Sequence, residues 1–255
     1  MIKVLDGVRV LEHGTFITGP AAAMLLADLG ADVVKVELPG TGDPFRAFKG
    51  GLYSPHYQTV NRNKRSVTLN TKQPADLEKF DALVRDADVY LQNFRPGFAE
   101  QIGTGFDRLR GINDKLIYCV ISGFGAIGPA AQRPAYDSVA QAASGFLGLL
   151  VNPGNPRVTG PAIADLVTGF YAAYGSLGAL YEREKSGCWT CSRRSARSMR
   201  KGLRTICWNA RKSGGLIWGW RRNEASRRDA NPRPKPIMPS APSAHFLHPT
   251  RQKNT

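Results

Sequence analysis

Residues 1–187 contain no tryptophan and a single cysteine, and residues 188–255 contain almost no acid. All four tryptophans lie after Gly187, where 16 of the 35 Lys and Arg side chains are accompanied by only two acids, Glu224 and Asp229. The first part keeps 19 basic and 18 acidic residues and is nearly neutral, so the net charge of +15 belongs to the tail. Two compositions in one chain predict a boundary after Gly187.

The sequence also lacks a secretory signal and a membrane span. Residues 1–6 contain no apolar stretch, and no apolar run approaches the roughly 20 residues that cross a bilayer. Cys119 lies in an apolar, strand-like run, which favours a buried reduced thiol. These features predict a cytoplasmic protein that does not associate with membranes.

Strand-like and helix-like segments alternate along the first part. Strand patterns cover residues 8–12, 32–36, 66–69, 88–91 and 115–122, and residues 74–84 are helix-like. An Ala-rich helix is expected up to Leu29, with Thr18 as its N-cap and Gly30 at its end. The strand–helix–strand spacing fits a parallel crossover and predicts a layered α/β domain.

Three longer segments complete the first part. Residues 38–62 are rich in Gly, Pro and aromatic residues and are too long for a plain connection, which predicts a functional loop. Two apolar helices are expected at residues 136–150 and 163–184. The stretch between them, residues 152–156, is rich in turn formers.

Two motifs suggest phosphate binding, and both are weak. Gly40-Thr41-Gly42-Asp43-Pro44 lacks the third glycine and the following helix of a dinucleotide site. Residues 61–66 form a basic cluster that suits the phosphates of a nucleotide-like ligand, but taken alone the cluster is better explained as a solvated surface loop.

Asn93-Phe94-Arg95-Pro96-Gly97 follows the fourth strand. Ligands of open α/β sheets bind outside the carboxyl ends of strands, where an amide, an aromatic ring and a guanidinium could hold an adenine. The alternative is a simple turn, because Pro-Gly is a strong turn signal.

Asp165 and Asp137 each stand in an apolar, small-residue segment. A carboxylate in such surroundings is usually a helix cap, an ion-pair partner or a functional group. A helix is expected to begin near Asp165, so the residue pattern leaves N-capping and catalysis equally open.

Taken together, these segments resemble the family III CoA-transferases, also known as the carnitine dehydratase / bile-acid-inducible protein family. The matching segments occur in the family's order and near its spacing throughout residues 1–187. They are residues 9–12, 19–37, 42–44, 63–66, 93–97, 122–125, 136–137 and 164–165.

The resemblance implies a Rossmann-like large domain that moves CoA between carboxylic acids. It places the nucleophile on Asp165, whose carboxylate attacks an acyl-CoA thioester to give a mixed anhydride and then a thioester with CoA. It also places Asp137 in the catalytic site and implies a homodimer whose subunits interlock, without a metal. The CoA contacts that it implies are Leu69, Lys72, Asn93 and Phe94, with Arg95 as a neighbour.

Related racemases carry a histidine where this chain has Tyr136. A racemase needs a paired acid and base to exchange an α-proton, and tyrosine is a poor base near neutral pH. The alternative of an α-methylacyl-CoA racemase-like enzyme is therefore disfavoured against CoA transfer.

The tail does not continue the family pattern. After Gly187 the family places a strand ending in Asp-Val, whereas this chain has Cys188-Trp189-Thr190-Cys191. Joining the third base of each codon to the first two bases of the next can give Leu-Asp-Val from these four residues, with the Leu and Asp steps fixed by the code. The same shift can give Thr-Phe-Pro-Thr-Pro-Asp from residues 244–250, which resembles a later family segment. We therefore expect residues 188–255 to be a frameshifted translation.

Other interpretations of the tail are a basic nucleic-acid-binding arm and a disordered segment. Lys, Arg and Trp suit phosphate contacts and base stacking, but the tail has no zinc-ligand spacing and no helix-turn-helix or RNA-binding motif, which disfavours nucleic acid as a partner. Pro- and Ser-rich residues 231–249 suit disorder. In either case the chain would be a non-catalytic remnant, and a truncated transferase is expected to be poorly soluble or inactive.

Overall fold

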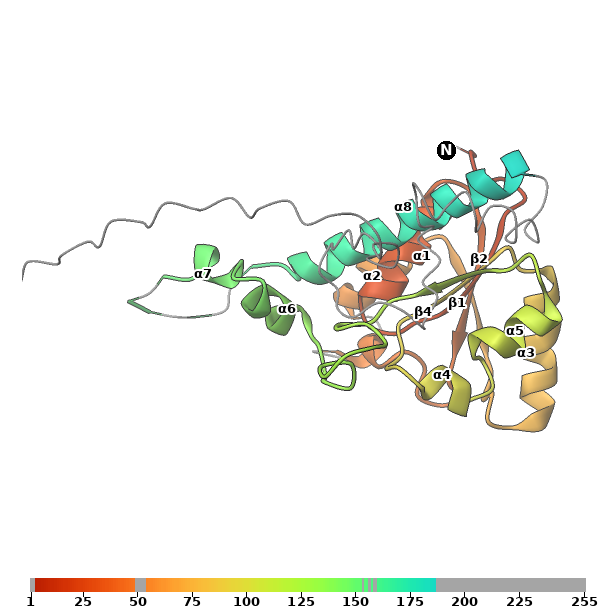
Figure 1. Cartoon of the computed structure of the whole chain (residues 1–255), viewed down its shortest axis with the longest axis horizontal. Coiled ribbons are helices and arrows are strands. Elements are labelled where there is room, and N and C mark those ends of the chain that lie inside the picture. The colour runs from red at the N-terminus through yellow and green to blue at the C-terminus, as the bar shows by residue number, and fades with distance from the viewer. Residues whose placement is uncertain (1–2, 49–53, 153, 156, 158–159, 187–255) are drawn as a thin grey trace, which may run out of the picture. The chain divides into compact units, whose positions relative to one another are not determined.

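The computed structural model describes residues 3–48, 54–152, 154–155, 157 and 160–186. These residues form a five-stranded parallel sheet in the order β3-β2-β1-β4-β5 (Figure 1). The strands are β1 (Arg9–His13), β2 (Asp32–Glu37), β3 (Lys64–Thr68), β4 (Val89–Gln92) and β5 (Ile117–Val120). The chain changes direction across the sheet between β1 and β4, as in Rossmann-like folds, so the predicted α/β class is confirmed.

Helices cover both faces of the sheet. Helices α1 (Thr18–Asp28) and α8 (Ile163–Ser186) pack on one face, and α3 (Pro74–Asp86) and α5 (Phe106–Ile112) pack on the other (Figure 1). The shorter helices are η1 (Pro44–Ala47), α2 (Pro55–Asn61), α4 (Phe98–Gln101), α6 (Asp137–Ala143) and α7 (Leu147–Leu150). The tail, residues 188–255, and its expected frameshift lie outside the described residues.

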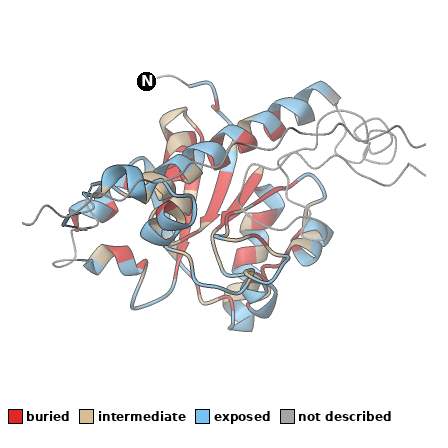
Figure 2. Ribbon diagram, turned by 60° about the vertical axis from the view of Figure 1, so that its left-hand side comes forward, coloured by how far each residue is buried: buried red, intermediate tan, exposed pale blue. Residues whose placement is uncertain are grey.

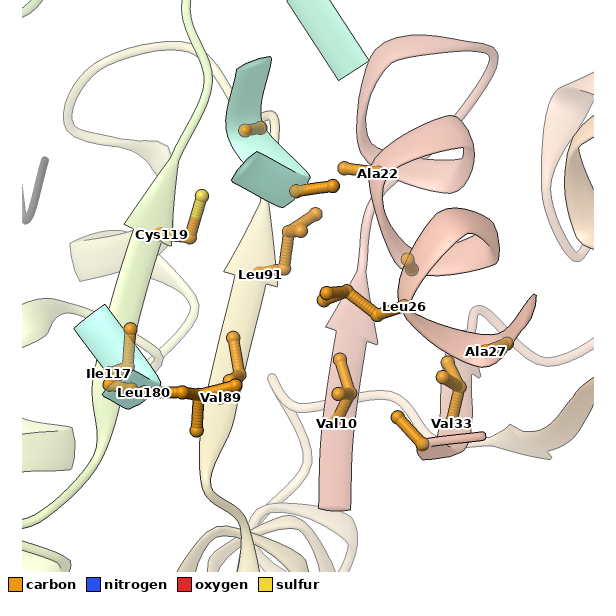
Figure 3. Close-up of a cluster of buried hydrophobic side chains, with 14 of the residues drawn as sticks. Val10, Ala22, Leu26, Ala27, Val33, Val89, Leu91, Ile117, Cys119 and Leu180 are labelled. Atoms are coloured by element: carbon orange, nitrogen blue, oxygen red, sulfur yellow. The ribbon is translucent and has the colours of Figure 1, made fainter. Parts of the chain in front are cut away.

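Successive strand residues enter two separate cores. Val10 and Val89 pack with Leu26 beneath α1 and α8, as Figure 3 shows, whereas Leu11 and Tyr90 face α3 and α5. Each fully buried side chain of this size contributes about 1.5–3 kcal/mol. Apolar residues of β1, β2, β4 and β5 enter both cores, so the sequence of these strands does not tell which residue faces which layer.

The sequence predicted the C-terminal end of α1 correctly but not its N-cap. Thr18 is the first helical residue and not the N-cap, so that prediction was wrong; no side-chain hydrogen bond comes from Ile17, the residue before the helix. The Thr18 hydroxyl instead accepts a hydrogen bond from Asn93 Nδ2 at 2.9 Å. Gly30 ends the helix as predicted, with a φ of 101° that favours glycine.

Two other predictions need correction, and two short helices were not predicted. The loop at residues 38–62 contains the short helices η1 and α2. The single helix expected at residues 136–150 is two helices, α6 and α7, separated at Gly145, where φ is 77°. Helices α4 and α5 were not expected, because four and seven residues give too little periodic signal.

Apolar side chains are exposed along the outer side of α8 and on α6 and α7 (Figure 2). Phe170 is 58% exposed, Tyr174 is 60% exposed and Leu149 is 82% exposed. A concentration of exposed apolar side chains on neighbouring elements is typical of a face that another segment or chain covers. Within the part of the chain that the structure describes, no helix has the length and apolarity to traverse a bilayer.

Candidate active site

The loop between β1 and α1 lies where the strand order reverses, at the carboxyl ends of β1 and β4. Asn93, the first residue after β4, holds this loop with its side-chain amide. Its Oδ1 accepts from the Thr15 N–H at 2.9 Å, and its Nδ2 donates to Thr15 O at 2.8 Å and to the Thr18 hydroxyl. Asn93 therefore ties together the two strand ends that flank the crevice in which Rossmann-like folds bind ligands.

Aromatic rings extend from this point across the same edge of the sheet. Phe94 lies edge-on to His13, with ring centroids 4.8 Å apart, and 5.2 Å from Phe98. The Lys72 ammonium lies 5.8 Å from the Phe98 centroid. The resemblance placed Lys72 and Phe94 at CoA, and both contact Phe98. The sequence analysis did not predict Phe98 as a site residue.

The remaining two predicted CoA contacts differ from each other in exposure. Leu69 is buried in the core below α3, and its N–H donates to Glu37 O at 2.9 Å. Arg95 is exposed and its carbonyl accepts from the Phe98 N–H. All five predicted CoA residues follow the carboxyl end of β3 or β4, so the fold brings them to one edge.

Asp137 and Asp165 meet at the start of α8. Asp137 Oδ1 accepts from the N–H groups of Ala164 at 2.8 Å and Asp165 at 3.2 Å, and Asp137 Oδ2 accepts from Gln141 Nε2. Asp137 thus caps α8 from another helix, and Asp165, in the first turn, is not the capping residue. Among the described residues, no hydrogen bond is made by the Asp165 carboxylate.

The surroundings of Asp165 disfavour its charge. Burial, reinforced by the nearby Asp137 carboxylate, raises the pKa of Asp165 from 3.8 to about 6. At neutral pH the group is still mostly ionised. A carboxylate that is poorly solvated and lacks hydrogen bonds is a better nucleophile than one in water.

The start of α8 is fixed against α1 by a close contact at Gly169, one turn after Asp165. A Cβ at this position would lie 2.8 Å from Ala21 Cβ and 3.0 Å from Thr18 O. Because Asn93 binds the Thr18 hydroxyl, one contiguous set of contacts joins the first turn of α8 to the loop after β1.

A buried ionic network supports the same loop from below. Lys35 and Glu12 are 1% and 0% exposed, and Lys35 Nζ contacts Glu12 Oε1 at 2.7 Å and Asp43 Oδ2 at 3.0 Å. Lys64 Nζ lies 2.7 Å from Glu12 Oε2. The sequence analysis missed this network, although charged residues at apolar strand positions were a usable signal.

The two lysines of the network respond differently to it. Burial opposes the charge of both, but Glu12 and Asp43 together raise the pKa of Lys35. Lys64 has burial and the Lys35 charge against it, and its pKa falls to about 8. Lys35 is therefore a fixed cation at the base of the loop.

The basic cluster at residues 61–66 does not form an open cationic surface. Arg62 pairs with Asp28, Arg65 pairs with Asp32 at 2.5 Å, and Lys64 is buried. The cluster consists of the three residues before β3 and the first three residues of β3, so its backbone lies toward the amino ends of the parallel strands, away from the edge that carries Asn93. The phosphate-binding interpretation of this cluster is therefore not supported.

A cavity of about 210 Å³ also opens at the amino ends of the strands, with Arg9, Asp32 and Arg65 among its lining residues. It lies on the opposite edge from the residues that follow β1 and β4. Within the described ranges, no group of three or more His, Cys, Asp or Glu residues is placed to hold a metal ion.

The sequence model of CoA-transferase family III matches residues 5–189. The chain belongs to CoA-transferase family III. The match to the family model ends at residue 189, close to Gly187, where the composition changes.

Two relatives that are themselves named CoA-transferases are similar to this chain over most of its length. It is 40% identical over 190 residues to human succinyl-CoA:glutarate CoA-transferase, and the alignment covers 73% of this chain and 43% of the relative. It is 44% identical over 191 residues to formyl-CoA:oxalate CoA-transferase from Streptomyces avermitilis, covering 73% and 46%. This family III chain thus spans less than half the length of either relative.

A solved structure agrees with the observed fold. A CAIB/BAIF family protein from Brucella suis superposes with a TM-score of 0.69 at 32% identity. The match covers 80% of this family III chain and 59% of the Brucella chain.

Proposed function

We propose that this chain carries the CoA-binding edge and the nucleophile of an enzyme that transfers CoA between an acyl-CoA thioester and a carboxylic acid. The observation that carries the proposal is Asp165: a partly buried carboxylate with a raised pKa, at a helix start that Asp137 caps. Membership of family III, whose relatives are CoA-transferases, supports the same chemistry.

In the first half-reaction the Asp165 carboxylate attacks the thioester carbonyl of acyl-CoA. The C–S bond breaks, its electron pair leaves on sulfur, and the products are an acyl-aspartyl anhydride and the CoA thiolate. The thiolate then attacks the aspartyl carbonyl of the anhydride. The donor acid leaves as its carboxylate, and CoA is held as a thioester on Asp165.

In the second half-reaction the acceptor acid reverses these steps. Its carboxylate attacks the aspartyl thioester, expels the CoA thiolate and forms a new anhydride. The thiolate attacks the acyl carbonyl of that anhydride, which gives the new acyl-CoA and frees Asp165. The cycle consumes neither water nor protons, so partial burial of Asp165 serves it by limiting hydrolysis of both intermediates.

CoA is assigned to the edge formed by the carboxyl ends of β3, β1 and β4. Lys72 and Arg95 supply cations for its phosphates, and Phe94 and Phe98 supply ring faces for its adenine. Leu69 is buried, so its contact with CoA comes from its backbone. Asn93 acts chiefly by shaping the loop after β1, because its amide is bonded to Thr15 and Thr18.

Racemisation of an acyl-CoA is the weaker alternative. Tyr136 stands at the position of the racemase histidine and is 67% exposed. Asp137 accepts three hydrogen bonds and is occupied as a helix cap. Tyr136 and Asp137 are therefore a poor acid–base pair for exchanging an α-proton.

Assembly also belongs to the proposal. We assign the exposed apolar face of α8, α6 and α7 to contacts in a homodimer and with the part of the relatives that this chain does not span. Cytoplasmic location and the frameshifted origin of residues 188–255 remain part of the same proposal. A chain without these contacts is expected to be poorly soluble or inactive in turnover, but its nucleophile can still be labelled.

Trapping the aspartyl intermediate tests the proposal. The full chain is incubated with acyl-CoA thioesters, quenched in acid and digested with trypsin, which releases residues 158–183 as one peptide containing Asp165 and Glu182. Fragmentation should place an acyl or CoA adduct on Asp165 and none on Glu182, and Asp165→Asn should abolish it. Failure of every thioester to label Asp165, in the chain and in a version with the reading frame restored after Gly187, would refute the assignment.

A further inference from the structure

The loop after β1 is anchored at three consecutive residues by three side chains from different strands or loops. Lys35 Nζ donates to Gly14 O at 2.8 Å. Asn93 bonds both backbone groups of Thr15. Asp43 Oδ1 accepts from the Phe16 N–H at 3.1 Å. A loop on a protein surface normally leaves such backbone groups to water, so this loop is held in one shape.

The shape is one that the loop would not adopt unaided. Phe16 has a φ of 61°, a left-handed conformation that bulky residues rarely take. Such a residue costs about 1–3 kcal/mol and persists where its surroundings dictate it. Gly14 has little room for a side chain, because a Cβ there would lie 3.2 Å from Asn93 Oδ1 and 3.2 Å from Gly19 Cα.

Lys35 and Asp43 anchor the loop with a buried ion pair. Their side chains are 1% and 0% exposed, and their charged atoms lie 3.0 Å apart. Removing either partner leaves the other charge buried and unpaired, which proteins tolerate poorly. Each member also makes a hydrogen bond to the loop backbone: Lys35 donates to Gly14 O, and Asp43 accepts from the Phe16 N–H. The ion pair therefore fixes two points of the loop relative to each other.

We propose that Lys35 and Asp43 are positioning residues for CoA transfer, which hold residues 14–16 in the conformation that receives CoA at the carboxyl ends of β1 and β4. The inference rests on the proposed function. Ligands bind at this crevice in Rossmann-like sheets, and a loop ordered before binding does not lose further conformational freedom when the ligand arrives. The strain at Phe16 is held by the fold, so binding does not have to supply it.

Asp43→Ala tests the role of the anchor. This variant removes the acceptor of the Phe16 N–H, whereas Asp43→Asn keeps an oxygen acceptor and loses only the charge facing Lys35. Glu37→Gln is the matched control: Glu37 is an equally buried acid of the same region, but it contacts Arg46, Ser66 and the Asp43 N–H and none of residues 14–16. All are made in the full chain and compared where circular dichroism shows native folding.

Two readouts are measured. Amide hydrogen exchange should accelerate at Thr15 and Phe16 by about tenfold in Asp43→Ala, less in Asp43→Asn and not at all in Glu37→Gln, with β4 and β5 unchanged in all three. The Kd for CoA, by calorimetry, should rise about tenfold in Asp43→Ala, with partial rescue in Asp43→Asn. A purely structural role would move overall stability but not the Kd of the folded protein.

The outcomes separate the two levels of inference. Unchanged exchange at residues 15–16 in Asp43→Ala overturns the anchor itself. Faster exchange with an unchanged Kd for CoA overturns the positioning role and leaves the proposed function intact. If exchange is faster in Asp43→Ala but the wild-type chain binds no CoA, the proposed function is contradicted, and the positioning role with it. The anchor then stands as a structural feature only.

Discussion

Replacing Asp165 by asparagine should stabilise the fold at neutral pH. The pKa of Asp165 lies at about 6 in the folded chain, above its ordinary value of 3.8. Between these values the folded state binds more protons than the unfolded state, so the folded state loses stability as pH rises through about 6. Asparagine has nearly the same shape and no charge, and it removes this cost.

The size of the effect follows from the same shift. A difference of about two pH units corresponds to about 3 kcal/mol. Asp165 is only partly buried, so water screens much of this energy. The charge also interacts favourably with the amino end of α8, by about 0.5 kcal/mol, and asparagine gives this up. A net gain of about 1 kcal/mol is expected at about pH 7.5, with no gain at about pH 3.5, below both pKa values.

Urea unfolding followed by circular dichroism at these two pH values measures the difference. The control is Asp137→Ala, which removes the acceptor of the Ala164 and Asp165 N–H groups. It should destabilise the chain by about 1 kcal/mol near neutral pH, the usual cost of a lost helix cap. If Asp165→Asn is no more stable than wild type at about pH 7.5, the carboxylate is not desolvated, and its proposed activation as a nucleophile fails with it.

Two further predictions concern packing and the reading frame. Gly169→Ala should destabilise the fold by about 1–3 kcal/mol in urea, because its Cβ would lie 2.8 Å from Ala21 Cβ. Gly178→Ala on the same helix, where nothing lies within 4 Å, should stabilise by about 0.5–1 kcal/mol; equal effects of the two would contradict the α1–α8 contact. Restoring the reading frame after Gly187 should raise soluble yield and turnover, whereas measurable transferase turnover by the 255-residue chain would contradict the expected inactivity. A peptide mass from residues 188–255 together with an intact resequenced gene would contradict the frameshift.

Much of the fold was accessible from the sequence because its signals are local. The five strand patterns, Gly30 at the end of α1 and the long helix at residues 163–184 all appear in the structure within a few residues. Errors fell where a local signal was weak or ambiguous. Thr18 resembles an N-cap, yet its hydroxyl is bound by Asn93 from 75 positions away, a contact that no local pattern encodes.

The basic cluster shows a different kind of error. Charge clustering suggested phosphate binding, but the cluster lies at the start of β3, and the ligand edge of a parallel sheet is the one that follows the strands. The order of elements in the sequence contained that information. The pairing of Arg62 with Asp28 and of Arg65 with Asp32 did not, because those contacts depend on how the strands pack.

By itself, the sequence determined the α/β class, the family and the chemical identity of the candidate nucleophile, because these depend on periodicity and on motifs in a fixed order. It did not decide whether Asp165 is a helix N-cap or a catalytic residue. Only the tertiary structure assigned the capping to Asp137 and left the Asp165 carboxylate partly desolvated, since that division depends on α6 reaching the start of α8. The anchored loop after β1 was likewise decided in three dimensions: Lys35, Asp43 and Asn93 come from three separate segments, and only the folded sheet brings them to one loop.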